Sequence, residues 1–173
     1  MKTVLIVVAN NWFQDYEFST TYEALQRDNS QITIAAWRKW VCVWVFGLRV
    51  DAVYSLHEVH WDKFEMVVYI GWWGALTQYL HDNDYLRIAQ EAKKVWAICI
   101  APMVLSESWI FNGKTVTSWN DEWLQKSFIE WFGWSRKDEP VIRCWNVVTA
   151  NWPEAAEDFW LECVKLLNDE TLY

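Results

Sequence analysis

Three short runs of apolar, largely β-branched residues constrain the fold of this chain more than any other feature of its sequence. They are Lys2–Ala9, Phe64–Ile70 and Val95–Ile98, and none alternates strictly with polar residues. Continuous runs of this kind are typical of strands that are buried on both faces of a parallel sheet. Helical periodicity follows the first run over Asp15–Arg27 and precedes the third over Asp82–Lys94. The pattern predicts a parallel sheet with helices on both faces.

The other segments fit the same architecture. We expect further strands over Gln31–Trp37, Thr115–Thr117, Val141–Ile142 and Asn146–Ala150, a hairpin within Val41–Val50, and helices over Ala101–Ser108, Asp121–Phe132 and Pro153–Asn168. A chain of 173 residues can bury a full core. Because no linker, repeat or shift in composition divides it, residues 1–173 are interpreted as a single domain. The expected fold is a doubly wound, flavodoxin-like α/β sandwich with a mostly parallel sheet and a small β-hairpin.

Charge and cysteine content argue against several classes of function. Lys and Arg number 15 and Asp and Glu 23, giving a net charge of −8, which disfavours binding to nucleic acid or anionic membranes. No apolar run approaches the ~20 residues that a membrane helix needs. The four cysteines show no C-x-x-C spacing, so we expect a reduced, cytoplasmic protein. His57 and His60 are too loosely spaced for a metal site, and we expect neither a metal nor a cofactor.

Cys99 directly follows the run Val95–Ile98, and a helix with Pro102 near its start is expected just after it. This places the cysteine at the carboxyl edge of the sheet, beside the unpaired N–H groups of a helix start, which favours the thiolate. The same strand–turn–helix geometry exposes the nucleophile of elbow-type hydrolases. We therefore expect Cys99 to be the most reactive of the four thiols. A buried, inert cysteine is the alternative interpretation.

Glu17 lies at the start of the first expected helix, just after the segment that follows the first expected strand. In a doubly wound sheet this junction lies on the same edge as the Cys99 junction, so Glu17 can reach Cys99. A carboxylic acid there can donate a hydrogen bond to a thiolate or stabilise a sulfinate. The alternative is an acid placed at a helix start for its dipole.

Several motifs together make the chain resemble the ThiJ/PfpI superfamily, which has the class I glutamine amidotransferase-like fold. They are K-T-V-L-I-V-V-A-N-N-x-F-x-D-x-E at the start, A-I-C-I-A-P at the elbow, and the late G-K-T-V-T-S and N-V-V-T-A segments. The resemblance implies that Cys99 is the reactive cysteine and Glu17 its partner. It also implies that Gly71 and the amides of Gly74 and Ala75 form a cradle for an oxyanion or sulfinate. A homodimer or a larger homo-oligomer is a further implication.

The chain departs from the family pattern where a catalytic histidine is expected. Ile100 stands where protease-like members carry His, and Trp119 lies in the turn from which deglycase-like or glyoxalase-like members supply one. Without an imidazole as base, we expect no working peptidase. We expect a weakened, cysteine-based reaction on small carbonyl compounds, of glyoxalase or deglycase type. The alternatives are a redox-responsive stress protein and a catalytically silent scaffold of the same fold, engineered or natural.

The chain is rich in tryptophan and poor in glycine, with 16 Trp and 5 Gly. Tryptophan occupies six positions where members of the superfamily usually carry Gly or another small residue: Trp40, Trp44, Trp72, Trp109, Trp145 and Trp152. Glycine supplies positive φ in turns, and tryptophan at such a φ is costly. Three explanations stay open: an engineered chain, a sequence that is uncertain at these positions, or a branch whose turns tolerate Trp. We expect Trp72 and Trp73 to cover the thiol or to block substrate entry.

Overall fold

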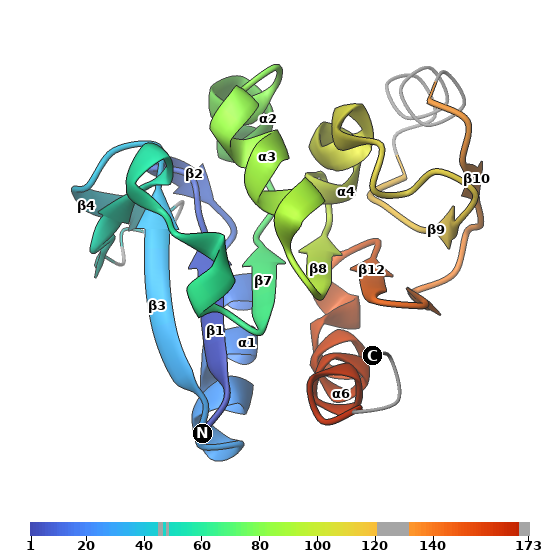
Figure 1. The fold of residues 1–173 in the computed structure, drawn as a ribbon, viewed down its shortest axis with the longest axis horizontal. Helices are drawn as coiled ribbons and strands as arrows, with labels where there is room; N and C mark the ends of the chain where they lie inside the picture. Colours follow the sequence, from blue (N-terminus) through green and yellow to red (C-terminus); the bar gives the residue numbers. More distant parts are fainter. Residues whose placement is uncertain (45–46, 48, 121–131, 170–173) are drawn as a thin grey trace.

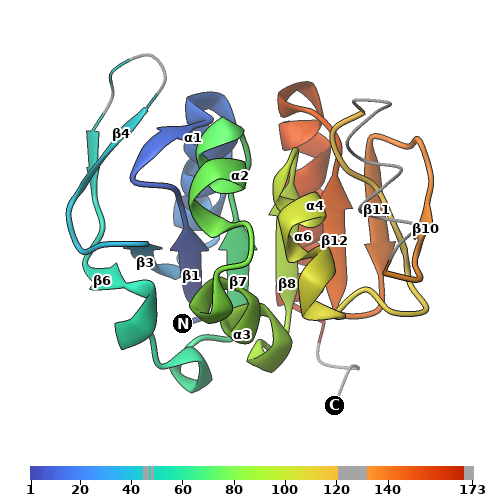
Figure 2. The ribbon, with the colours of Figure 1, turned by 90° about the horizontal axis from the view of Figure 1, so that it is seen from above.

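The computed structural model describes residues 1–44, 47, 49–120 and 132–169. Its centre is a seven-stranded sheet in the order β11-β12-β8-β7-β1-β3-β6 (Figures 1 and 2). The strands are β1 (Thr3–Val7), β3 (Gln31–Ala36), β6 (Tyr54–Ser55), β7 (Met66–Tyr69), β8 (Val95–Ile98), β11 (Val141–Cys144) and β12 (Val147–Ala150). All neighbouring strands are parallel except β11 and β12. The predicted parallel sheet is confirmed.

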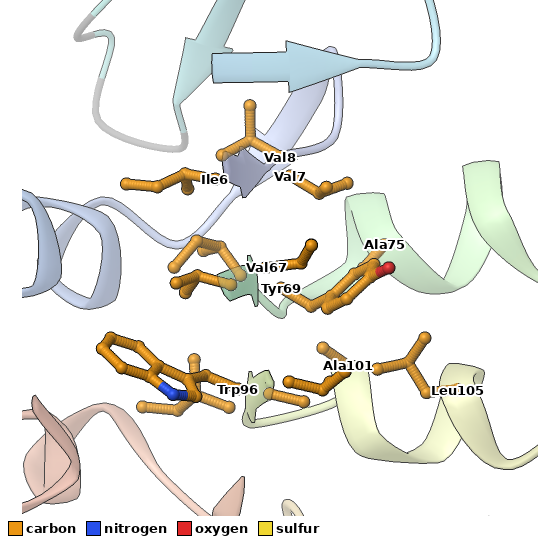
Figure 3. Packing of buried hydrophobic residues seen from close by; sticks show 14 of the residues in the cluster. Ile6, Val7, Val8, Val67, Tyr69, Ala75, Trp96, Ala101 and Leu105 are labelled. Carbon is orange, nitrogen blue, oxygen red and sulfur yellow. The ribbon is translucent and has the colours of Figure 1, made fainter. Parts of the chain in front are cut away.

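Helices cover both faces of this sheet, as the continuous apolar runs predict. One face carries α1 (Asp15–Arg27) and α6 (Ala156–Leu167), and the other carries α2 (Trp73–Tyr79), α3 (Asn83–Glu91) and α4 (Ala101–Leu105). Figure 3 shows Ile6 and Trp96 pointing to the first face, and Val7 and Tyr69 pointing to the second. Trp96 packs edge-on against Phe159 of α6 at 6.3 Å. Alternate side chains are therefore buried in different layers, which explains why β7 and β8 are apolar along their whole length.

The start of α1 is fixed by a side chain from the residue before it. The Gln14 side-chain oxygen accepts hydrogen bonds from the backbone N–H groups of Tyr16 (2.6 Å) and Glu17 (3.4 Å). These groups have no partner within the helix, so the glutamine serves as its N-cap. The cap holds Glu17 in the first turn of α1, at the carboxyl edge of the sheet.

Two smaller sheets flank the central one. The first contains β2 (Asn11–Phe13), β4 (Val41–Trp44) and β5 (Arg49–Asp51), and the second contains β9 (Thr115–Val116) and β10 (Ser135–Arg136). β4 and β5 pair antiparallel, which confirms the predicted hairpin. Phe13 of β2 packs against Phe18 at 5.7 Å and against Trp44 at 5.1 Å. These rings join the first small sheet to α1.

The predicted elements differ from the observed ones mainly at their ends. The helices expected over Ala101–Ser108 and Pro153–Asn168 are each a short α-helix joined to a 3₁₀ turn, Ser106–Ser108 in one and Pro153–Ala155 in the other. The short helix α2 was not predicted. The helix expected over Asp121–Phe132 lies, except for its last residue, outside the described residues. Within the described part of the chain, no helix is long and apolar enough to cross a membrane.

The expected backbone strain is present at three of the six tryptophans named above. Trp72, Trp109 and Trp145 have positive φ values of 90°, 61° and 56°. Trp44 lies in a strand and Trp152 has a φ of −134°, so neither needs a glycine-like backbone. Three of these six positions therefore hold tryptophan in a conformation that favours glycine, at a cost of order 1–3 kcal/mol each. Trp12 in β2 is a further tryptophan with positive φ, at 58°.

Candidate active site

Cys99 occupies a strained position between β8 and α4. Its φ is +61°, a left-handed conformation that residues other than glycine seldom adopt. Its N–H donates to the carbonyl of Ala150 at 2.9 Å, and its carbonyl accepts from the N–H of Trp119 at 2.8 Å. Hydrogen bonds on both sides of the residue hold the predicted strand–turn–helix junction in place.

Gly71 allows the backbone after β7 to approach Cys99 closely. A Cβ atom added at Gly71 would lie 2.5 Å from the carbonyl oxygen of Ile98 and 2.7 Å from the Cβ of Cys99. Real Cβ atoms do not approach other atoms so closely, so the packing here requires glycine. The N–H of Gly71 donates to Oε2 of Glu17 at 3.2 Å. Gly71 therefore positions the acid as well as the cysteine.

The carboxyl group of Glu17 is completely buried beside the thiol of Cys99. Burial raises the pKa of Glu17 to about 8, and the nearby charges of Glu154 and Asp15 act in the same direction. Its Oε1 atom has no hydrogen-bond partner among the described residues. At neutral pH the side chain is mainly a neutral carboxylic acid with a proton available next to the sulfur.

The thiol of Cys99 is also protonated at neutral pH. Burial raises its pKa well above the usual value, and a charge on Glu17 would raise it further. The backbone N–H groups of Ile100 and Trp72 act in the opposite direction by donating to the sulfur. The thiolate expected at rest from the helix start is therefore wrong. Helix α4 has only five residues, and its first N–H groups do not outweigh complete burial.

Accessibility also argues against the expected order of thiol reactivity. Cys99, Cys42 and Cys163 have no exposed surface, whereas Cys144 is partly exposed. A reagent in solution meets Cys144 first. Chemistry at Cys99 therefore requires a small molecule to enter the buried site.

The structure brings only some of the predicted lining residues to the sulfur. Trp72 and Ile100 contribute their N–H groups, and Trp119 hydrogen-bonds to the Cys99 carbonyl. Ala75 does not contribute, because its N–H donates to the Trp72 carbonyl at 3.0 Å within the first turn of α2. A Cβ atom at Gly74 would collide with the backbone of β2, so this glycine serves packing. The donors to the sulfur are thus the amides of Trp72 and Ile100, in place of the Gly74–Ala75 pair implied by the resemblance.

Three tryptophan side chains contact one another near this site. Trp119 contacts Trp73 edge-on at 5.9 Å and Trp152 edge-on at 5.8 Å. Beside them lies a cavity of about 680 Å³, lined by Gln14, Tyr16, Trp72, Trp152, Pro153, Glu154 and Glu157. The sequence interpretation missed this cavity, because its walls come from segments that are distant in sequence.

None of the three histidines, all of which lie in the described part of the chain, is next to the thiol of Cys99. His81 pairs with Glu107 at 2.8 Å, and His57 and His60 lie in and beside the 3₁₀ turns that precede β7, at the opposite end of that strand from Gly71. No group of three or more His, Cys, Asp or Glu residues suited to a metal ion occurs in the described part of the chain. Among the described residues, the ionisable side chain that contacts the thiol of Cys99 is that of Glu17.

An α/β sandwich with a strained cysteine at a strand–helix junction and a buried acid beside it defines a class of elbow-cysteine proteins. The chain belongs to the DJ-1/PfpI family, whose sequence model matches residues 2–166.

Relatives of known sequence or structure cover nearly the whole chain. An uncharacterized protein of Methanocaldococcus jannaschii is 28% identical over 173 residues, which is 95% of this chain and 82% of that protein. A protein named a deglycase from Pyrococcus abyssi is 23% identical over 94% of this chain and 98% of its own length. The crystal structure of a ThiJ/PfpI domain protein from Brachyspira murdochii matches with a TM-score of 0.87 and 22% identity, covering 96% of each chain. This last similarity concerns the fold alone.

Proposed function

We propose that this protein uses Cys99 as a nucleophile on small carbonyl compounds, with 2-oxoaldehydes as the substrate class. The observation that carries the proposal is the surroundings of the sulfur. The sulfur interacts with a buried, protonated acid and with two backbone N–H donors, from Ile100 and Trp72. The relative from Pyrococcus abyssi that is named a deglycase also supports a reaction on carbonyl compounds.

The proposed reaction begins with addition of the thiol to the aldehyde carbon. The S–C bond forms and the carbonyl π bond breaks, while the thiol proton ends on the carbonyl oxygen, giving a hemithioacetal. Before attack, the N–H groups of Ile100 and Trp72 stabilise the negative charge that develops on the sulfur. The proton of Glu17 can be delivered to the oxygen while its carboxylate accepts the proton of the thiol, so its protonation state is restored.

A proton shift and hydrolysis complete the proposed cycle. In the fraction of molecules in which Glu17 is ionised, its carboxylate removes the proton from the hemithioacetal carbon and returns it to the neighbouring carbon. The hydroxyl proton passes to the neighbouring carbonyl oxygen, so the hemithioacetal becomes a thioester. Water then cleaves the C–S bond, which releases a 2-hydroxy acid and restores the thiol. No external oxidant or reductant is consumed. Because the pKa of Glu17 is about 8, its basic form is a minority at neutral pH, and we expect turnover to rise from pH 6 to pH 9.

Peptidase activity is not part of this proposal. An amide carbonyl is less electrophilic than an aldehyde, and its cleavage needs a base that activates the thiol and an acid for the leaving amine. Ile100 stands beside Cys99 where an imidazole would serve both steps. Cleavage of unstructured casein that is lost in Cys99→Ala would contradict this view.

The test is formation of lactate from methylglyoxal by the purified protein. We expect slow turnover that is lost in Cys99→Ala and reduced in Glu17→Gln. The matched control is Cys144→Ser, which alters a more exposed thiol and should leave turnover unchanged. Turnover that survives in Cys99→Ala would refute the proposal. Sedimentation of the same samples tests the homodimer or larger homo-oligomer that we propose from the resemblance.

A redox role is the second candidate, because the same groups suit an oxidised sulfur. The N–H donors of Ile100 and Trp72 can bind sulfinate oxygens, and the neutral acid of Glu17 can donate a third hydrogen bond. Mild peroxide should then add two oxygen atoms to the parent and none at this position in Cys99→Ala, as measured by peptide mass. A protein that shows neither turnover nor this oxidation would be a silent scaffold.

A further inference from the structure

The cavity that Trp72 helps to line contains side chains that take no part in the proposed reaction. Three of its seven lining residues are aromatic: Tyr16, Trp72 and Trp152. The indole of Trp152 makes an edge-on contact with Trp119 at 5.8 Å, which restricts its orientation. Tyr16 and Trp152 remain 48% and 38% exposed, so their rings are available to a ligand. Its volume of about 680 Å³ lies within the range of small-molecule sites.

The charged groups of the cavity are all of one sign. Glu154 and Glu157 line it, and no Lys, Arg or His stands among the described residues of its wall. Neither carboxylate forms an ion pair or hydrogen bond within the described residues. Two other acids of these helices do form ion pairs, Glu23 with Arg27 and Glu162 with Lys165. Two carboxylates therefore share one cavity, and none of the described residues that line it carries a positive charge.

A third acidic group, the buried carboxyl of Glu17, lies close to this cavity. Glu154 in its wall is near enough to raise the pKa of the buried Glu17, whose Oε1 has no hydrogen-bond partner in the described part of the chain. The wall of the cavity and the buried group beside it thus bring three acidic side chains close together, with no positive charge among the described lining residues. Gln14, the one amide in the wall, cannot supply its oxygen to a ligand freely, because that atom already caps α1.

We propose that this cavity binds an organic cation of side-chain size, either an alkylammonium or a guanidinium group. Aromatic rings attract such cations through their electron-rich faces, and carboxylates complement the charge. Weakly hydrated organic cations gain more from aromatic walls than small inorganic ions do, because they lose less hydration on entry. The proposal concerns binding and does not depend on the reaction at Cys99.

The test uses the Cys99→Ala variant of the 173-residue chain, so that no turnover interferes. Choline is titrated while the indole N–H signals of the tryptophans are followed by NMR, and Nα-acetylarginine amide serves as a second cation. The neutral isostere of choline, 3,3-dimethylbutan-1-ol, controls for size. We expect saturable shifts with at least one cation, and binding of the neutral isostere at least about fivefold weaker, the ratio that a cation–π contact of about 1 kcal/mol gives.

Paired variants locate the binding. Trp152→Leu and Glu157→Gln should each weaken the affinity by about fivefold or more. Their controls are Trp145→Leu, an exposed tryptophan outside the cavity, and Asp158→Asn, in the same first turn of α6 but not in this wall. Absence of a saturable shift with both cations would overturn the proposal. So would equal affinity for the neutral isostere, or an equal loss in the control variants. Turnover of methylglyoxal has no bearing on any of these outcomes.

Discussion

Replacing the buried Glu17 by Gln should remove a loss of stability that occurs as the pH rises. The pKa of this carboxyl is about 8 in the folded protein and 4.5 in its ordinary state. Between these two values the folded protein holds a proton that the unfolded chain has released. The free energy of unfolding must then decrease with rising pH, so the stability is fully present below about pH 4.5 and is lost up to about pH 8.

The size of the effect follows from the same two pKa values. Each pH unit within the window changes the free energy of unfolding by about 1.4 kcal/mol, so the loss between pH 5 and pH 9 is roughly 4 kcal/mol. Glutamine has no charge to desolvate, and its oxygen can still accept from the N–H of Gly71. At pH 5 we therefore expect melting temperatures that differ by only a few degrees, since ~1 kcal/mol shifts a domain of this size by ~2–4 °C.

Urea unfolding followed by circular dichroism at pH 5, 7 and 9 measures this difference. The parent should lose most of the stated free energy over this range, whereas Glu17→Gln should lose clearly less. The exposed Glu157→Gln serves as the control and should follow the parent. Parallel curves for parent and Glu17→Gln would refute the argument, because the carboxyl would then titrate as if it were solvated. In the same variant we expect the rate of peroxide oxidation at Cys99 to change several-fold.

The remaining predictions concern the strained backbone and the thiols. Trp145→Gly should raise the melting temperature by ~2–4 °C, because φ is 56° and the side chain is 73% exposed. Trp40→Gly, at 74% exposure and without positive φ, should not stabilise, and an equal gain in calorimetry would contradict the strain argument. Gly71→Ala should lower the melting temperature and slow oxidation of Cys99, because its Cβ would meet backbone at 2.5 Å; an unchanged oxidation rate would be inconsistent with this packing. Limiting iodoacetamide with peptide mapping should label Cys144 before Cys99, and the reverse order would mean that the site opens readily.

Much of the central sheet could be predicted because its strands are buried on both faces. That environment demands continuous apolar runs, and the strand Val95–Ile98 was predicted at its observed bounds. Helix α1 was also predicted at its observed bounds, Asp15–Arg27. Helix α2 escaped prediction because its seven residues are too few to show helical periodicity. The helix starts after Trp72, whose φ is 90°. A tryptophan in the sequence gives no reason to expect this backbone conformation.

The site was only partly predictable for a related reason. Topology places Glu17 and Cys99 at one edge of the sheet, and this follows from the order of strands and helices alone. The protonation of the pair does not follow from local sequence. It depends on how completely the surrounding layers exclude water, and that burial raises the pKa of the thiol that a helix start was expected to lower.

The left-handed turns at Trp72, Trp109 and Trp145 also bear on how this gene can change. The tryptophan codon UGG and the glycine codon GGG differ in one base, so each strained turn is a single transversion away from the residue that its backbone favours. Few stabilising substitutions are so accessible to point mutation. A randomly mutagenised library selected for resistance to heat should therefore return glycine at the two more exposed of these positions, Trp109 and Trp145, before it returns multi-base changes elsewhere.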